Sequence, residues 1–408
     1  MIGITLLIIP QNFAMYGFYT GALGVVLVFV VNSISTYLII KARNVFKRQQ
    51  VTSLSDLAVL CYGDKAKLPM DIFVIAIQFS FLFAYNIFLG DQLDQILCKI
   101  LMVTECGKSD YYKVIICLLL LPFVLQKSLK NVALFSIFAL ASTLVSIAIV
   151  LGLETEIQSH SYTFIQREMS LHLEDKDFNY KYIEWCNLPM VASTFMALYE
   201  GNSIIVSIYA ETAEPKHFVR DVISGYAVVA TFAILFGYFS YLTLGDKITD
   251  IILLVLPTNS DAAVICKIMY LFTIMGSYVL IIQPIFNILE NFQRFKDFDL
   301  FGEETKFYVQ RALVVGVSII GAILLPNVNV VLQFTGSIGG TLIGVVIPIM
   351  LYHKAYEVAS SRAEHRYVKP QDWKRNFLSY VVFVVGTAIG IIGFGISVYD
   401  LAAAKPVV

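Results

Sequence analysis

The residue of this sequence that most directly suggests chemistry is a glutamate within an apolar stretch. Glu200 lies inside the stretch 188–209, and Gly201 and Asn202 follow it. An ionisable side chain at membrane depth is costly and is therefore a functional candidate, although Glu200 could equally serve as a structural clamp on broken backbone. Backbone that leaves a helix inside a membrane is tolerated only where it lines a protein-enclosed or wet cavity. The stretch therefore indicates an interrupted helix beside a cavity.

A second interrupted stretch begins the chain. Residues 1–16 are apolar, Pro10 interrupts them, and Gly17 and Gly21 follow. A half-helix that starts inside a membrane presents free N–H groups to a carboxylate, and freed carbonyls suit a cation or an ammonium group. Glycine and proline also serve simple close packing, so each stretch alone has another explanation. Together they indicate a transporter with inverted repeats, because the interrupted spans one and six are five spans apart.

The composition indicates an all-α integral membrane protein. Of the 408 residues, 58% are hydrophobic and 14% are charged, and the mean hydropathy is +0.75. Soluble domains have about 25% charged residues, and a membrane-spanning helix needs about 20 apolar residues. Eleven stretches have a suitable character: 1–16, 18–42, 70–97, 111–126, 131–153, 188–209, 222–244, 263–289, 309–325, 328–352 and 377–399.

These stretches predict a single transmembrane domain. We expect repeat one at 1–153, an outer loop at 154–187, repeat two at 188–352 and an extra helix at 377–399. Most lysines and arginines fall in alternate loops, whereas the loop 154–187 is acidic. The positive-inside rule therefore predicts a cytoplasmic start and a C-terminus on the other side, in a plasma membrane or a vacuolar or lysosomal membrane.

The first stretch is too short to span a membrane. Sixteen residues reach only about 24 Å at 1.5 Å per residue. A signal peptide is disfavoured, because no basic segment precedes the apolar residues and no small-residue cleavage site follows them. We expect the outer half of a broken first helix, with the inner half truncated.

Further motifs follow in a fixed order along the chain. Tyr199, Glu200 and Gly201 form an aromatic-Glu-Gly series in the sixth stretch. Other motif residues lie in the first, third, seventh and eighth stretches and just after the seventh: Gly3, Leu7, Ile9, Pro10, Phe13, Gly17 and Gly21; Asp91, Gln92, Leu93 and Gln95; Gly237, Tyr241, Gly245, Asp246, Leu256 and Pro257; Ser277, Tyr278, Leu280, Pro284 and Glu290. The series resembles the amino acid/auxin permease family, most closely its proton-coupled amino acid transporter branch.

This resemblance implies a LeuT-like fold with two inverted five-helix repeats and alternating access. The substrate would be an amino acid bound where the first and sixth helices break. The residues implied for its carboxylate are Gly3, Ile4 and Thr5, and those implied for its amino group and side chain are Tyr199, Glu200 and Gly201. Thr5 departs from the family pattern, which has a glycine there and so lacks a Cβ at the closest backbone approach.

The resemblance also implies a coupling ion, either H⁺ or Na⁺, and no other cofactor. Thr273 and Ser277 would face the cation position used by sodium-coupled relatives, although such hydroxyls also bond the carbonyl one turn back. The branch favours protons, and Glu200 is the candidate protonation site. Relatives pair two outer loops by a disulfide, which implies a bond between Cys106 and Cys186.

Other functional classes are less well supported. The five histidines lie in loops or at helix ends, so no metal or general-base cluster suggests an enzyme. The charge segregation informs topology rather than nucleic-acid binding. We expect a transporter of small neutral amino acids, because the sequence places no charged side chain besides Glu200 at the inferred pocket. An amino acid sensor on the same fold, which binds without transporting, is the alternative, and the oligomeric state stays open.

Overall fold

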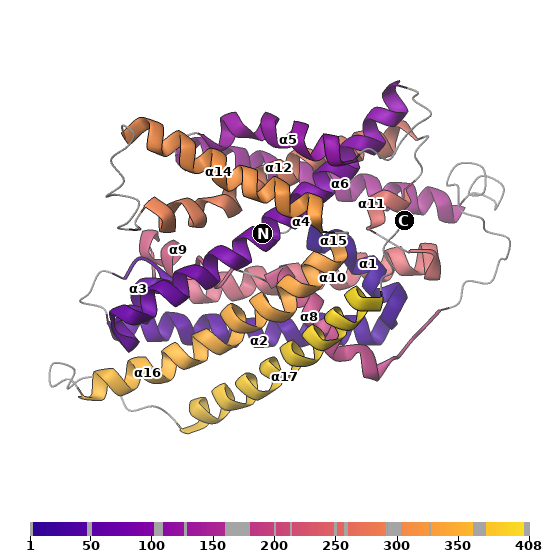
Figure 1. Cartoon of the computed structure of the whole chain (residues 1–408). Coiled ribbons are helices and arrows are strands. Elements are labelled where there is room, and N and C mark those ends of the chain that lie inside the picture. The colour runs from indigo at the N-terminus through magenta and orange to yellow at the C-terminus, as the bar shows by residue number, and fades with distance from the viewer. Residues whose placement is uncertain are drawn as a thin grey trace.

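The structure is a computed structural model of the chain and is a bundle of helices (Figure 1). Among the described residues no strand is present. Those residues are 3–46, 51–101, 109–125, 129–159, 180–199, 201–212, 214–248, 251–256, 260–290, 292, 303–325, 328–361 and 373–403.

Each of the eleven predicted stretches coincides with a helix or an interrupted series of helices. The elements are α1 (Ile4–Tyr16), α2 (Phe18–Val45), α4 (Lys67–Leu101), α5 (Ser109–Val124), α6 (Leu129–Ser159), α8 (Leu188–Met196) with α9 (Ile205–Glu211), α10 (Phe218–Leu244), α12 (Asp261–Glu290), α14 (Glu303–Leu324), α15 (Val328–Phe334) with α16 (Ile347–Ser361), and α17 (Trp373–Ala403). Within the described ranges, eight helices are long and apolar enough to cross a membrane, and Ile4–Tyr16 is a shorter apolar helix.

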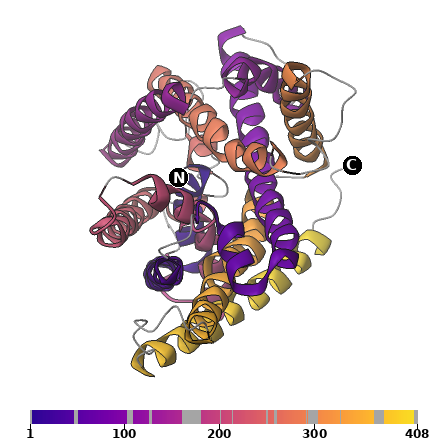
Figure 2. The same ribbon diagram turned by 90° about the vertical axis from the view of Figure 1, so that its left-hand side faces the viewer.

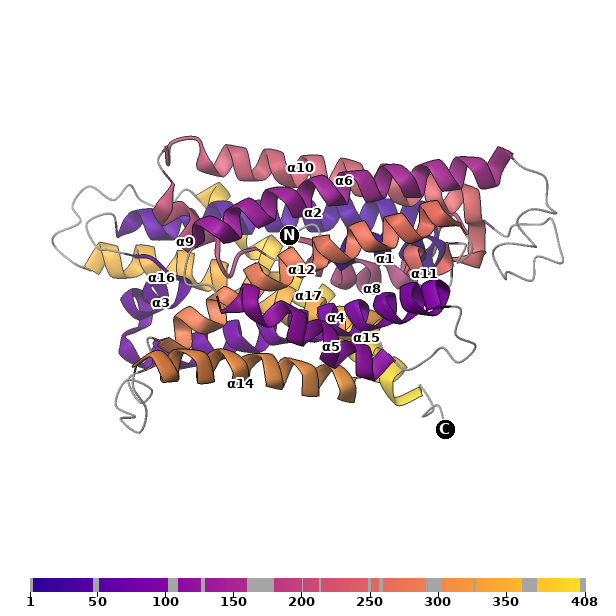
Figure 3. The same cartoon turned by 90° about the horizontal axis from the view of Figure 1, so that it is seen from above.

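The long helices form two groups (Figures 1 and 2). In the α12 group, α12 packs against α6 and α4, and α4 packs against α5 and α14. In the α2 group, α2 packs against α8, α10 and α16, while α1 packs against α10 and α17 against α8. Contacts between α6 and α10 join the groups along one edge, where these two helices run side by side (Figure 3).

Several local features differ from the sequence prediction. The connection after α2 holds a short helix, α3 (Leu54–Tyr62), and the outer connection after α10 holds α11 (Ile252–Val255). Ser53 and Asp56 form a reciprocal capping box at the start of α3, which satisfies two N–H groups of its first turn. Helix α6 continues past the predicted end at 153, so Glu154 lies in a helix and not in the predicted outer loop.

The tenth predicted stretch is not a uniform α-helix. Between α15 and α16 the backbone forms two π-helical segments, η5 (Thr335–Gly340) and η6 (Leu342–Val346). A π-helix widens the hydrogen-bonding register from i→i+4 to i→i+5. This shift changes which backbone carbonyls are available to neighbouring elements. The Gly344 carbonyl of η6 accepts a hydrogen bond from Asn202 in the sixth span.

Candidate substrate site

The N-terminal end of α1 is held between two buried tyrosines. Gly3 precedes the helix, and its carbonyl accepts a hydrogen bond from the Tyr270 hydroxyl of α12 at 2.9 Å. A Cβ on Gly3 would lie 2.6 Å from the Tyr85 hydroxyl oxygen of α4, so the close approach of α4 requires a glycine. The first-turn N–H groups of Ile4 and Thr5 precede the first intrahelical bond, and no side chain caps this end.

The sixth span is interrupted as predicted. Helix α8 ends at Met196, a 3₁₀ turn η3 (Ala197–Tyr199) follows, and α9 begins at Ile205. Gly201 and Asn202 lie in the non-helical segment and are buried. Glu200 lies outside the described residues, so its role stays a prediction.

Asn202 fixes the interrupted backbone to two other elements. Its side chain is 1% exposed, and its Oδ1 accepts a hydrogen bond from the Thr36 hydroxyl of α2 at 2.8 Å. Its Nδ2 donates to the Gly344 carbonyl of η6 at 3.2 Å. Gly344 lies in the second π-helical segment, where backbone hydrogen bonds join residues five apart instead of four. Its carbonyl accepts the bond from Asn202.

A third element holds the same segment. The Ser203 hydroxyl accepts a hydrogen bond from Gln78 Nε2 of α4 at 3.1 Å. Gln78 is 1% exposed, so this bond is also buried. The interruption is therefore bonded to α2, α4 and η6, and polar backbone at membrane depth is enclosed by protein, as such backbone requires.

The first helix contacts the interruption of the sixth span. Helix α1 contacts both α8 and η3, so the element that carries Gly3, Ile4 and Thr5 lies beside the one that ends at Tyr199. Tyr199 is 2% exposed, and its ring packs edge-on against Tyr226 of α10 with centroids 5.4 Å apart. Among the described residues its buried hydroxyl has no hydrogen-bond partner, which leaves it free for a ligand.

Thr273 and Ser277 lie on α12, and Thr273 faces α6. The Thr273 hydroxyl donates to the Ala139 carbonyl of α6 at 3.1 Å and accepts from the Thr143 hydroxyl at 3.2 Å. It also lies 3.3 Å from the Met269 carbonyl of its own helix. The Ser277 hydroxyl bonds the Thr273 carbonyl one turn back at 3.1 Å. Ser277 therefore bonds the carbonyl one turn back, and Thr273 joins a cluster of oxygen atoms between α6 and α12.

The C-terminal end of α1 is covered by residues 180–187, here called the strap. The first N–H groups of α2, those of Phe18 and Tyr19, donate to the carbonyls of Lys181 and Tyr182 at 3.2 and 3.0 Å. Gly17 turns the chain between α1 and α2 with φ +90°, and a Cβ there would lie 3.0 Å from the Tyr182 carbonyl carbon. Glycine is thus required both for the turn and for the strap.

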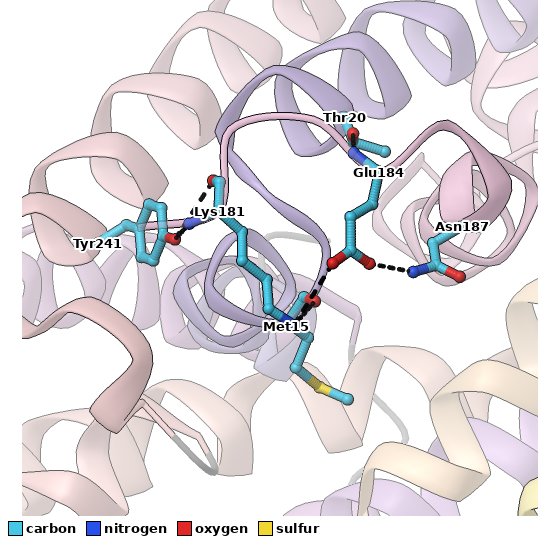
Figure 4. A network of polar contacts seen from close by, with 6 residues as sticks. All are labelled: Met15, Thr20, Lys181, Glu184, Asn187 and Tyr241. Carbon is cyan, nitrogen blue, oxygen red and sulfur yellow. Dashed lines mark hydrogen bonds and ion pairs between the residues drawn. The ribbon is translucent and has the colours of Figure 1, made fainter. Parts of the chain in front are cut away.

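The strap also joins α2 to α10 (Figure 4). The Tyr241 hydroxyl of α10 accepts a bond from the Lys181 N–H at 2.6 Å, and Thr20 Oγ1 of α2 accepts one from the Glu184 N–H at 2.8 Å. The Glu184 carboxylate accepts a bond from Asn187 Nδ2 at 2.6 Å and lies 3.5 Å from Lys181 Nζ. This network links α2 and α10 beside the C-terminal end of α1.

The predicted disulfide is not supported. Cys186 carries a free, exposed thiol in the strap, which contradicts a bond from it to Cys106. Cys106 lies outside the described residues. The disulfide-bonded cysteine in the described part is Cys98, near the C-terminal end of α4.

Sequence reasoning found the interruption of the sixth span, whereas the interruption expected at Pro10 is absent, because Pro10 lies inside the continuous helix α1. It also missed the residues that contact Gly3 and the sixth-span interruption. Tyr85 and Tyr270 lie in apolar stretches, where an aromatic residue is ordinary, so no local signal distinguishes them. Gln78 is a polar residue within an apolar stretch, which is a signal that could have identified it. Asn202 belongs to the series that marked the break, but its two bonds depend on tertiary packing.

The sequence also matches known proteins. Residues 1–398 match the profile of a family described as transmembrane amino acid transporter protein. Solute carrier family 38 member 10 of Rattus norvegicus is 23% identical over 88% of the chain, and the putative sodium-coupled neutral amino acid transporter 10 of Xenopus laevis is 23% identical over 88%. Amino acid transporter ANT1 of Arabidopsis thaliana is 24% identical over 86% of the chain and 81% of its own length. The chain spans about a third of the rat and frog proteins, 32% and 34% of their lengths.

The fold matches a solved transporter. The inward-facing conformation of Mhp1 aligns with a TM-score of 0.54 and 14% identity, covering 100% of this chain and 92% of the other. At this identity the match shows the fold alone, and it confirms the predicted LeuT-like fold. The bounds of the two predicted repeats stay a prediction.

We predict that the requirement for Gly3 depends on the Tyr85 hydroxyl. Gly3→Ala should destabilise the protein by about 1–3 kcal/mol, because the new methyl overlaps the hydroxyl oxygen. In a Tyr85→Phe background the same change should cost clearly less. Thermal unfolding of the purified variants measures both costs, with Gly152→Ala as a control because a Cβ there meets no atom within 4 Å. Equal costs of Gly3→Ala in both backgrounds would contradict the geometry.

We also predict that Asn202 and Thr36 act as a pair. Asn202→Ala leaves two buried groups without a partner, at a cost of about 1–3 kcal/mol each, whereas Thr36→Val removes one hydroxyl. The double variant should therefore lose less stability than the sum of the single variants. Thr231→Val is the control, because the Thr231 hydroxyl bonds its own helix at 2.9 Å. Additive losses for Asn202 and Thr36 would exclude the pairing.

Proposed function

The chain belongs to the transmembrane amino acid transporter family, and on that premise we propose that it is a secondary active transporter of small neutral amino acids, coupled to protons. The observation that carries the proposal is the contact of α1 with η3, at the interruption of the sixth span, inside the bundle. The family and the relatives are transporters and not enzymes. The substrate and the coupling ion are the parts that experiments must decide.

In this proposal the substrate carboxylate binds at the start of α1. The N–H groups of Ile4 and Thr5 point out of the helix N-terminus, and the helix dipole favours an anion there. The Tyr270 hydroxyl bonds the Gly3 carbonyl and fixes the backbone there, and the Tyr85 hydroxyl lies beside Gly3. The side chain of Thr5 is 5% exposed, so this end of α1 is enclosed by protein.

The amino group and side chain of the substrate then face the interruption of the sixth span. Tyr199 offers a buried hydroxyl without a partner in the described residues, and the backbone at Gly201 is outside any helix. Glu200 supplies the negative charge that an ammonium group requires. A neutral substrate side chain is proposed because no other charged residue lies in the two interruptions, and the name of the frog relative specifies neutral amino acids.

Proton coupling is assigned to Glu200 in this proposal. A carboxyl at membrane depth can bind a proton when the substrate site is occupied and release it when the site opens on the other side. Thr273 and Ser277 are the residues that would serve a sodium ion, because Thr273 joins oxygen atoms of α6 and α12. The proposed orientation has the C-terminus on the non-cytoplasmic side of a plasma, vacuolar or lysosomal membrane.

The test is uptake of labelled proline, alanine and glycine into proteoliposomes that contain the full chain, under an imposed proton or sodium gradient. We expect accumulation driven by the proton gradient, with an uptake rate that depends on pH. Glu200→Gln should flatten that pH dependence, whereas Glu211→Gln, an exposed carboxyl on α9, should leave it unchanged.

The other outcomes are equally informative. Accumulation that requires a sodium gradient would contradict proton coupling and favour Thr273 and Ser277. Saturable binding without uptake would contradict transport and favour the sensor alternative. An unchanged pH profile in Glu200→Gln would remove Glu200 from the coupling step.

A further inference from the structure

A second carboxyl group lies inside the helix bundle, away from the interrupted spans. Glu154, on α6, is 0% exposed, and within the described residues neither of its carboxylate oxygens has a hydrogen-bond partner. The sequence alone suggests a solvated residue of an acidic loop, but α6 continues to Ser159 and carries Glu154 into the protein. A buried carboxyl without a partner is uncommon, because most buried polar groups are hydrogen-bonded.

The surroundings of Glu154 offer no charge to balance an ionised carboxylate. The Ser240 hydroxyl of α10, also 0% exposed, is the polar side chain of the described residues that interacts with the carboxyl, without the geometry of a normal hydrogen bond. Among the described residues no cation forms an ion pair with Glu154. The charged residues on the outer parts of α10, η4 (Gly245–Lys247) and α12 are Asp246, Lys247, Asp261 and Lys267. Of these, Lys267 is held by Gln95 of α4 at 2.7 Å.

Glu154 also lies at the boundary between the two groups of helices. Helix α6 belongs to the α12 group and α10 to the α2 group, and they run side by side along one of the edges where the groups meet (Figure 3). Helices α4 and α15 form another contact between the groups. The contact between Glu154 and Ser240 therefore exists only while the two groups are together at this edge. If α6 and α10 separated, water would reach the carboxyl.

These three observations link protonation to the position of the helices. A carboxylate that is buried without a cation or a hydrogen-bond donor is strongly disfavoured, whereas the neutral acid tolerates burial far better. The closed edge therefore favours protonated Glu154, and an open, hydrated edge favours the carboxylate. Proton binding and closing of the edge are therefore linked. If closing raises the proton affinity of Glu154 by some factor, protonation of Glu154 favours the closed edge by the same factor.

We propose that Glu154 is a proton-binding site that controls the opening of the edge between α6 and α10. The proton comes from the aqueous solution that enters when the edge opens, and it returns there when the edge reopens. An acidic solution keeps the edge closed, and an alkaline one opens it. The site differs from Glu200, which is assigned to the substrate, and it does not depend on which amino acid is carried.

The test measures access to the edge directly. Ser240→Cys places a thiol opposite Glu154, and a membrane-impermeant maleimide is applied to the full chain in lipid nanodiscs at several pH values. Cys186, whose thiol is free and exposed, is an internal reference for the ordinary effect of pH on thiol reactivity. Mass spectrometry gives the ratio of labelling at position 240 to labelling at Cys186.

We expect this ratio to rise by roughly tenfold or more between about pH 5 and about pH 8, since one linked proton can shift an equilibrium by up to tenfold per pH unit. In Glu154→Gln the ratio should be low and independent of pH, because a neutral amide cannot ionise. Glu154→Asp keeps an ionisable group and should keep the rise, and Asp246→Asn, which changes an exposed carboxyl beyond α10, should leave it unchanged.

A flat ratio with Glu154 present, or the same rise in Glu154→Gln, would overturn the proposal. The labelling requires no substrate, so its result is independent of the uptake experiment. A pH-dependent ratio beside absent uptake would refute the proposed transport and leave this site standing. Uptake with a flat ratio would refute the site and leave transport standing.

Discussion

Backbone that leaves a helix inside a membrane must find hydrogen-bond partners within the protein, and this constraint organises the molecule. The sixth span meets it through Asn202, which bonds Thr36 of α2 and the Gly344 carbonyl of η6. The π-helical segment η6 contributes to this bonding, because its Gly344 carbonyl accepts the bond from Asn202, which lies between α8 and α9. One interruption thus fixes the relative positions of α2, α4 and the tenth stretch.

The first helix satisfies the same requirement in another way. Its start is bonded through Gly3 to Tyr270, while the first-turn N–H groups stay available for an anion. Beyond the C-terminal end of α1, the strap supplies carbonyls to the first N–H groups of α2, those of Phe18 and Tyr19. The strap backbone therefore satisfies the start of α2, whereas no side chain of the described residues caps the start of α1. That difference is why the start of α1 is the proposed position of the substrate carboxylate.

Much of this architecture follows from the sequence. The eleven apolar stretches and the interruption at Gly201 and Asn202 are local patterns, and each corresponds to a described element. The partners of the interruptions are not local, since Tyr85 and Tyr270 differ from other aromatic residues only in what they face. Glu154 is instructive for the same reason: its charge suggested a loop, whereas α10 buries it. The pairing expected of Cys186 rested on resemblance, and its thiol is free.

The central claim is that an amino acid binds where α1 meets the interruption of the sixth span. Hydrogen exchange of the full chain, with and without saturating proline, alanine or glycine, tests it most directly. Binding should slow exchange of the Ile4 and Thr5 amides and of residues 197–204 together, because the ligand would bond the first and order the second. A ligand that binds saturably but protects neither segment would contradict the claim.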